Sequence, residues 1–167
     1  RIDHPSQAPV RIREAFKHLQ TGRPRPVELE MPMDVMGQLS EVSLLPPESY
    51  AESDTHLEHI EQAAKLLAKA KKPLLVVGGG AQGANLEILQ MAELLQAPVT
   101  FFRSGKGVID ERHYLSQCFP AGHRLWKEVD VVLAIGTRLK YQQMYWGLDE
   151  NIKILRIDID PTEINRI

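Results

Sequence analysis

Several features that would assign a protein to a special class are missing from this sequence of 167 residues. Lys and Arg number 20 and Asp and Glu 22, so the formal net charge is −2 and there is no basic surplus for binding nucleic acid. The apolar runs have the length of strands, far short of the roughly 18 residues that suggest a membrane span. No signal-peptide pattern opens the chain. We therefore expect neither a nucleic-acid partner nor a membrane partner.

Cysteine is almost absent, because Cys118 is the only one. A single cysteine excludes a disulfide framework and a multi-cysteine metal site, and it fits the reducing cytoplasm. No neighbouring pattern activates the Cys118 thiol as a nucleophile, so we expect it to be packed.

The composition is that of an ordinary globular protein, with 43% hydrophobic and 25% charged residues. The length allows one well-buried domain and part of another. Because the chain begins at Arg1 without an initiator methionine and stops at Ile167 just after a helix-start signal, we expect it to be a piece of a longer protein.

Three segments are predicted from composition and periodicity. Residues 1–36 contain a helix over 10–20 and a strictly alternating strand, Val27–Met31, which cannot form a core alone. Residues 37–54 contain Pro46-Pro47 and scattered Ser and Glu, which is typical of a linker. Residues 55–167 form the main domain.

The main domain shows an α/β pattern. It opens with a helix that starts at a capping box of Thr55 and Glu58 and is closed by lysines at 69–72. Apolar strands then alternate with helices over about 84–96 and 122–128, and the predicted strands are 74–77, 99–102, 131–135 and 152–157. This spacing predicts an open, mostly parallel sheet with helices on both faces, a Rossmann-like fold of the nucleotide-binding type.

Four glycines follow the first of these strands, and Gly78, Gly80 and Gly83 fit the pattern G-x-G-x-x-G. Such a loop lets backbone N–H groups approach a pyrophosphate. A tight turn with close helix–sheet packing needs the same glycines without any ligand. The pattern alone leaves both interpretations open.

Ligands of open α/β sheets bind at the carboxyl ends of the strands. Four segments occupy such ends and are expected to line one crevice: 78–83, 103–107, 136–138 and 158–160. Asp158 either accepts hydrogen bonds from the hydroxyls of a ribose or merely ends a strand. Asp160 is expected to cap the helix that begins at Pro161.

Other motifs are weaker. Phe102-Arg103 stands where an NAD-dependent dehydrogenase has its ribose-binding acid, and Ser104–Gly107 lacks the residues of a P-loop. His56 and His59 are expected to be surface residues because no further ligand joins them. His113 and His123 receive no role.

The order and spacing of several stretches resemble the central domain of thiamine-diphosphate-dependent enzymes of the acetolactate synthase and pyruvate oxidase group. The matching stretches are 72–80, 97–100, 105–110, 130–138 and 157–161, and residues 11–36 resemble the end of that family's pyrimidine-binding domain. The resemblance implies that residues 1–36 are a truncated pyrimidine-binding domain and that 55–167 are the central domain.

The resemblance also implies that catalysis lies outside this chain. The activating glutamate of the family is expected upstream of Arg1, and the Gly-Asp-Gly segment that holds Mg²⁺ and thiamine diphosphate is expected downstream of Ile167. No catalytic or metal-binding residue is therefore assigned here. The implied partners are the missing pyrimidine- and diphosphate-binding domains and further copies in a homo-oligomer.

Central domains of the family hold FAD, ADP or nothing. The residues that contact such a nucleotide carry over to Gly78, Gly79, Gly80, Arg138, Asp158 and, through its backbone, Ile159. Two departures argue against FAD: Lys140-Tyr141 replaces an acidic pair, and the stretch 116–123 is short. The alternatives are a structural or oligomerisation module with an empty crevice and a sirtuin-like NAD-using deacylase, which lacks its zinc cysteines here.

Overall fold

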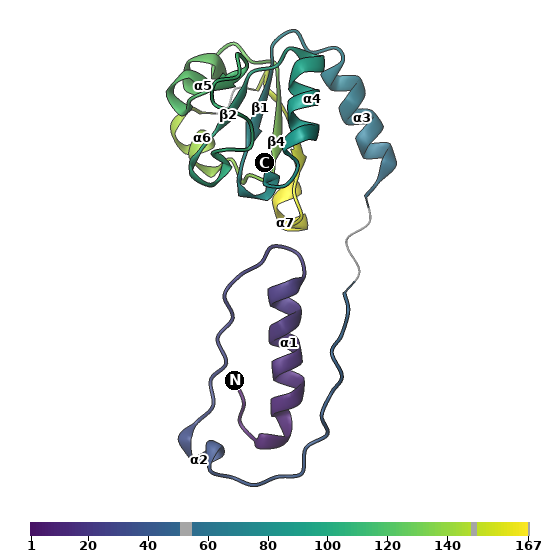
Figure 1. The fold of residues 1–167 in the computed structure, drawn as a ribbon, viewed down its shortest axis with the longest axis vertical. Coiled ribbons are helices and arrows are strands. Elements are labelled where there is room, and N and C mark those ends of the chain that lie inside the picture. Colours follow the sequence, from purple (N-terminus) through teal and green to yellow (C-terminus); the bar gives the residue numbers. More distant parts are fainter. Residues whose placement is uncertain (51–54, 148–149, 167) are drawn as a thin grey trace. The chain divides into compact units, whose positions relative to one another are not determined.

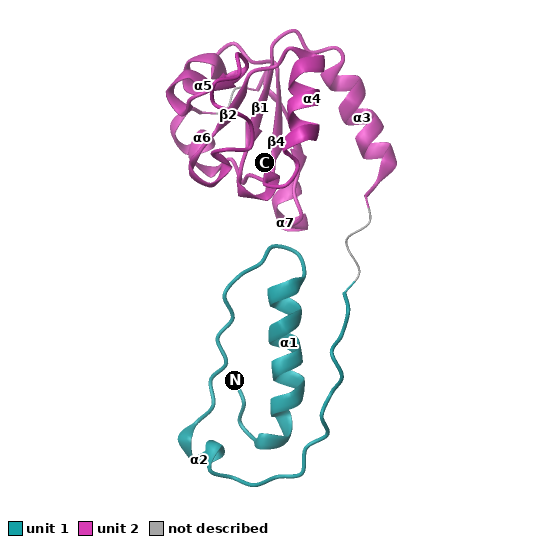
Figure 2. Cartoon of the chain, viewed as in Figure 1, with its two compact units in different colours: residues 1–54 teal, residues 55–167 magenta. Residues whose placement is uncertain are grey.

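A computed structural model describes residues 1–50, 55–147 and 150–166. The chain divides into two compact units, residues 1–54 and residues 55–167, which Figure 2 distinguishes by colour. Positions 51–54 of the predicted linker lie outside the described residues.

The first unit is built around one helix. A short 3-10 turn, η1 (Pro5–Gln7), leads into α1 (Ala8–Gln20), which confirms the predicted helix, and α2 (Met33–Met36) is a single turn that the sequence analysis did not predict. The predicted strand Val27–Met31 is wrong. A strand needs a neighbouring backbone to bond with, and the described part of this unit supplies one such bond, from Ile2 N to Glu30 O at 2.8 Å.

The second unit contains the predicted parallel sheet. Its strands are β1 (Pro73–Val77), β2 (Val99–Phe101), β3 (Ser116–Gln117), β4 (Val131–Ile135) and β5 (Lys153–Ile157). They pair in the order β3-β2-β1-β4-β5, and every pairing is parallel. Its helices are α3 (Leu57–Leu67), α4 (Asn85–Leu95), α5 (Phe119–Trp126), α6 (Lys140–Tyr145) and α7 (Pro161–Ile164), with the 3-10 turns η2 (Gly79–Ala81) and η3 (Arg103–Gly105). The open α/β fold is confirmed.

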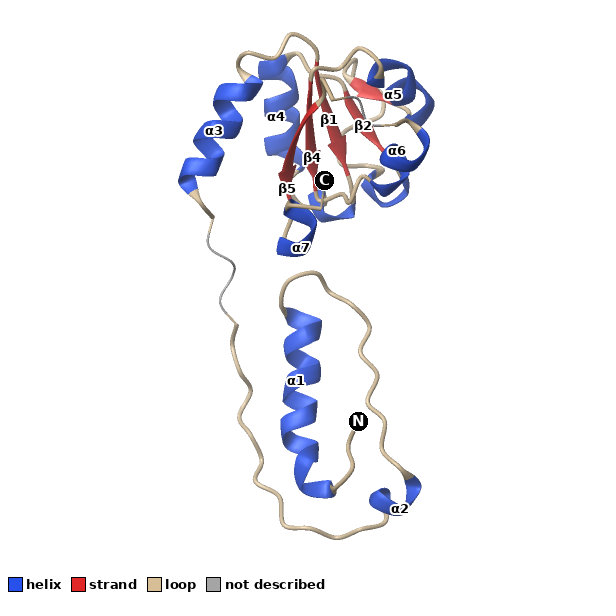
Figure 3. Ribbon diagram, turned by 180° about the vertical axis from the view of Figure 1, so that it is seen from behind, coloured by secondary structure: helices blue, strands red, loops and turns tan. Residues whose placement is uncertain are grey.

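Helices cover both faces of the sheet, with α3 and α4 on one side and α5 and α6 on the other (Figures 1 and 3). Alternate residues of β1 serve the two faces: Leu75 packs with Ile88 and Ala92 of α4, whereas Leu74 packs with Trp126 of α5. Because β1 is central and covered twice, Leu74–Val77 are at most 1% exposed. Its carboxyl end is therefore rigidly placed.

The predictions for both ends of helix α3 need correction. The capping box is wrong, since α3 starts at Leu57 with His56 as its N-cap and no side chain caps it. The helix also ends at Leu67, before the lysines, because the chain must turn into β1. In that turn the Asp130 carboxylate accepts hydrogen bonds from the amides of Lys71 and Lys72, at 2.6 and 3.0 Å.

Helix α5 spans Phe119–Trp126, whereas the sequence predicted about 122–128. Its earlier start places Cys118 at the N-cap position, where the residue is exposed, so the prediction of a packed thiol is wrong. None of the described helices is both long and apolar enough to cross a membrane.

Thr100 supplies a test of the packing between β2 and α5. It is fully buried, and its hydroxyl has no hydrogen-bond partner among the described residues. An unpaired buried hydroxyl costs about 1–3 kcal/mol, so we expect Thr100→Val to raise the free energy of unfolding by about 1 kcal/mol in a urea titration. Thr162→Val is the control that should lose stability, because the Thr162 hydroxyl donates to Asp160 at 2.6 Å. Equal losses in both variants would contradict the prediction.

Candidate functional site

The strand order reverses between β1 and β4, because the chain leaves β1 for β2 and β3 and then returns to the other side of β1. Ligand crevices of open α/β sheets lie at such a switch point, outside the carboxyl ends of the strands. Here the loops that follow β1 and β4 are hydrogen-bonded to each other. The Gly78 amide donates to Ile135 O at 2.9 Å, and the Gly80 amide donates to Gly136 O at 3.1 Å.

The glycines of the first loop make room for the second loop. A Cβ atom on Gly78 would lie 2.3 Å from Gly136 O, and one on Gly80 would lie 2.8 Å from the Cα atom of Gly136. Gly136 itself has a φ of +58°, and a Cβ there would lie 2.4 Å from the carbonyl carbon of Gly80. Close backbone packing therefore explains Gly78 and Gly80 without a ligand.

Gly79 and Gly83 have other reasons to be glycine. A Cβ on Gly79 would lie 3.0 Å from the Ser104 hydroxyl, in the turn that follows β2. Gly83 has a φ of +98° and open space around it, so its backbone conformation alone requires glycine.

Most N–H groups of the glycine loop are already used within the protein. Besides the two bonds to the β4 loop, Ala81 N donates to Gly78 O and Gln82 N to Gly79 O. The Gly79 amide has no acceptor among the described residues. It is therefore the group that this loop offers to an anion.

Arg138 and Asp158, predicted on the neighbouring strand ends, retain free polar groups. Arg138 is exposed, and its guanidinium makes none of the hydrogen bonds or ion pairs that the structure describes. Asp158 is half-buried, and its Oδ1 atom accepts from the Asp160 amide at 3.0 Å, which leaves Oδ2 for another donor. Ile159 is 57% exposed.

Asp160 is the predicted helix cap. Its Oδ1 accepts from the amide of Thr162 at 3.0 Å and from the Thr162 hydroxyl at 2.6 Å, at the start of α7. That prediction is confirmed, and it separates the roles of the two aspartates.

The turn after β2 is fixed to the glycine loop. The Gln82 side-chain amide donates to Ser104 O at 3.0 Å and to Lys106 O at 3.1 Å. The Lys106 ammonium lies 3.3 Å from the Glu111 carboxylate on the surface. This arrangement agrees with an ordinary turn instead of a P-loop.

Aromatic rings gather beside the crevice loops, a feature that the sequence analysis missed. Tyr141 of α6 lies 4.8 Å from Phe102 and 5.1 Å from Phe119, measured between ring centroids, and Phe119 lies 4.6 Å from Trp146. Helix α6 is only six residues long, and Leu139, the N-cap residue before it, has a φ of +53°. The spacing of Tyr141 and Tyr145, four residues apart, was its one sequence signal.

The histidines have structural contacts. The His113 Nε2 atom lies 3.2 Å from the Glu93 carboxylate, and His123 stacks on Trp146 with ring centroids 5.3 Å apart. The rings of His56 and His59 lie 5.2 Å apart. Within the described ranges, no group of three or more His, Cys, Asp or Glu side chains is arranged to hold a metal ion.

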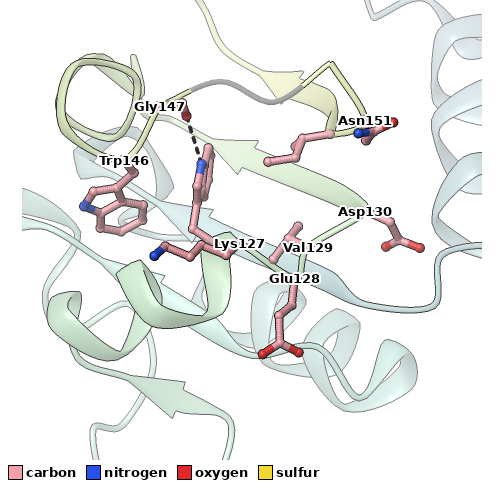
Figure 4. Close-up of a pocket in the computed structure, with 9 residues that line it drawn as sticks. Lys127, Glu128, Val129, Asp130, Trp146, Gly147 and Asn151 are labelled. Atoms are coloured by element: carbon pink, nitrogen blue, oxygen red, sulfur yellow. Dashed lines mark hydrogen bonds between the residues drawn. The ribbon is translucent and has the colours of Figure 1, made fainter.

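A cavity of about 450 Å³ lies at the opposite edge of the sheet, at the amino ends of β4 and β5 (Figure 4). Its lining includes Trp126, Asp130, Trp146 and Ile152, and the Trp126 indole donates to Gly147 O at 2.9 Å. None of the predicted site residues lines it. The candidate site therefore remains the set of loops at the carboxyl ends of the strands.

The parallel sheet, covered by helices on both faces, defines an open α/β domain. The family model described as "Thiamine pyrophosphate enzyme, central domain" matches residues 60–167. The chain belongs to this family.

Individual relatives agree with the family. A probable acetolactate synthase large subunit of Methanococcus aeolicus is 36% identical over 99% of this chain and 30% of its own length. A probable 2-ketoarginine decarboxylase of Pseudomonas aeruginosa is 32% identical over 96% of this chain and 30% of its own. The X-ray structure of a "putative thiamin diphosphate-dependent enzyme" from Mycobacterium smegmatis superposes with a TM-score of 0.68 at 22% identity, covering 96% of this chain and 33% of that one.

The chain spans about a third of the length of these relatives. Its residues 60–167 match the central domain of this family, and the chain resembles acetolactate synthase large subunits almost end to end. The sequence lacks Gly-Asp-Gly, the segment that the resemblance assigns to Mg²⁺ and thiamine diphosphate, so no site for this cofactor is assigned to these residues.

Proposed function

We propose that this domain serves a longer enzyme that decarboxylates a 2-keto acid and ligates the resulting carbanion to a second carbonyl compound. The observation that carries this proposal is the similarity to acetolactate synthases over 99% of the chain. Thiamine diphosphate and Mg²⁺ would be held by the domains that flank this one. The enzyme would be cytoplasmic and homo-oligomeric.

The domain's own contribution, in this proposal, is a nucleotide crevice that takes ADP or FAD. Three groups support it: the unbonded amide of Gly79, the exposed guanidinium of Arg138 and the second carboxylate oxygen of Asp158. The Gly79 amide and Arg138 would bind the diphosphate, and Asp158 would accept from the ribose beside the Ile159 backbone. Gly78 and Gly80 would shape the loop, because their amides are already bonded.

ADP is the favoured nucleotide. Lys140 and Tyr141 occupy the first turn of α6, where the resemblance would place acidic residues beside a flavin. Tyr141 contacts Phe102 and Phe119 and leaves 38% of its surface exposed.

A structural module with an empty crevice is the second candidate. It is supported by the mutual packing of the loops 78–80 and 136–138, which accounts for two of the glycines without any ligand. Thermal unfolding with ADP, FAD or NAD separates the two candidates, because a ligand bound only to the folded state raises the melting temperature. A shift with ADP supports the nucleotide crevice, and no shift with any of the three supports the empty module.

If the flanking domains hold thiamine diphosphate and Mg²⁺, this chain alone should not bind them. Calorimetric titration of the 167-residue chain with thiamine diphosphate and Mg²⁺ should show no specific heat of binding, because both halves of the cofactor site would lie in other domains. Micromolar affinity in that titration would contradict the proposal. A longer chain that includes the flanking domains should instead bind the cofactor and consume pyruvate.

A further inference from the structure

The loop Gly136–Leu139 has an unusual backbone. Gly136 and Leu139 both have positive φ, +58° and +53°. For leucine this conformation costs about 1–2 kcal/mol, so the surrounding structure must impose it. The Leu139 side chain is 1% exposed and packs in the core beside Trp126, which anchors one end of the loop.

Two arginines from distant parts of the chain hold the middle of this loop. Arg156, in β5, donates from Nη2 to the carbonyl oxygen of Arg138 at 3.4 Å. Arg166, beyond α7, donates to the same oxygen from its own Nη2. Both arginines bind the backbone of Arg138, so the Arg138 guanidinium takes part in neither bond.

The second arginine is itself fixed. Its Nε atom pairs with the buried carboxylate of Glu163, and its Nη1 donates to Gln143 Oε1 at 3.4 Å. The link from α7 through Arg166 therefore reaches both the loop and α6.

Arg156 is energetically unfavourable at its position. Its Nε and Nη1 atoms are buried without a hydrogen-bond partner among the described residues. Burial and the charge of Arg166 lower the pKa of Arg156, and Glu163 and Asp158 oppose this only in part. Two buried donors without partners carry a desolvation cost that a methionine side chain would not carry. Stability alone thus does not explain an arginine here.

We propose that Arg156 and Arg166 are positioning residues that hold the Gly136–Leu139 loop so that the Arg138 guanidinium faces the crevice. The functional part of this inference rests on the proposed nucleotide site, whereas the contacts that hold the loop do not depend on a ligand. The inference predicts that an Arg156 variant binds ADP more weakly while its stability in urea does not fall.

The test uses Arg156→Met, which keeps most of the apolar stem and removes the donors, in the full 167-residue chain. Amide hydrogen exchange of residues 137–143 should become about 2- to 10-fold faster, the equivalent of one lost hydrogen bond. The urea midpoint should stay unchanged or rise. The dissociation constant for ADP should increase by the same 2- to 10-fold.

Three further variants complete the test. Arg166→Met removes the second donor and should speed exchange of the same amides, and Arg156→Lys, which keeps a charged donor, should restore part of the protection. Arg124→Met is the matched control, because Arg124 is an exposed arginine of α5 with no described hydrogen bond or ion pair. It should change none of the three quantities: the exchange at 137–143, the urea midpoint and the dissociation constant for ADP.

A lower urea midpoint for Arg156→Met with unchanged exchange at 137–143 would overturn the inference, and so would exchange that rises uniformly through the sheet. If the wild-type chain does not bind ADP, FAD or NAD, the proposed nucleotide site fails. The exchange measurements still decide whether the two arginines hold the loop.

Discussion

Gly136→Ala is expected to lower the free energy of unfolding by about 2–5 kcal/mol. Two costs add at this residue. Its φ of +58° is unfavourable for alanine, and the new Cβ would lie 2.4–2.6 Å from the backbone of Gly80 and Ala81. Because those atoms belong to a loop fixed at both ends, they cannot move aside as a flexible side chain would. Urea unfolding followed by circular dichroism measures the loss.

Two other glycines separate these costs. Gly83→Ala has a φ of +98° but open space, so it should lose only the backbone cost of about 1–2 kcal/mol. Gly78→Ala has an ordinary φ of −122° but would place its Cβ 2.3 Å from Gly136 O, so its loss reports the close packing alone. If Gly78→Ala is as stable as the wild type, the packing explanation of the glycine loop is wrong.

The sheet was largely predictable from the sequence because its strands are buried on both faces. Short, continuous aliphatic runs such as Leu74–Val77 and Val131–Ile135 are typical of strands that are buried on both faces. Both strands were predicted to within one residue of their observed bounds. Val27–Met31 shows the opposite case. Alternation describes a strand with one covered face, but it does not supply the neighbouring strand that makes the pairing.

Helix boundaries failed where distant groups decide them. Thr55 and Glu58 satisfy the pattern of a capping box, yet the helix starts at Leu57, after that threonine. The lysines at 69–72 look like the end of a helix, but the Asp130 carboxylate, almost 60 residues away, holds their backbone in a turn. Local patterns do not contain such partners.

The sequence predicted which segments follow the strands, but it did not predict the hydrogen bonds that these segments make. The four segments were predicted because each follows a strand, and Asp160 was predicted as a cap because it precedes the helix that begins at Pro161. The role of each glycine depends on which loop approaches it, and Gly136 lies 56 residues beyond Gly80 in the sequence. The same holds for Arg156 and Arg166, since nothing in their sequence neighbourhood points to the carbonyl of Arg138.

Removing the Asp158 carboxylate should weaken ADP binding by about 10- to 100-fold. A hydrogen bond to a charged acceptor contributes about 1.5–3 kcal/mol, which corresponds to that range of affinity. Calorimetric titration of Asp158→Ala against the wild type measures the change. Arg138→Ala should also weaken binding, because it removes a charge that faces the diphosphate in the proposed site.

Asp158→Asn is the informative control for this prediction. The Asp158 carboxylate accepts a hydrogen bond from the Asp160 amide through Oδ1. An asparagine side chain keeps a carbonyl oxygen for that bond but loses the charge. If Asp158 binds ribose, the asparagine variant should match the wild type in urea stability and still bind ADP more weakly. If it instead binds ADP as tightly as the wild type and only Asp158→Ala is impaired, the carboxylate serves the turn at 158–160, and the ribose does not sit there.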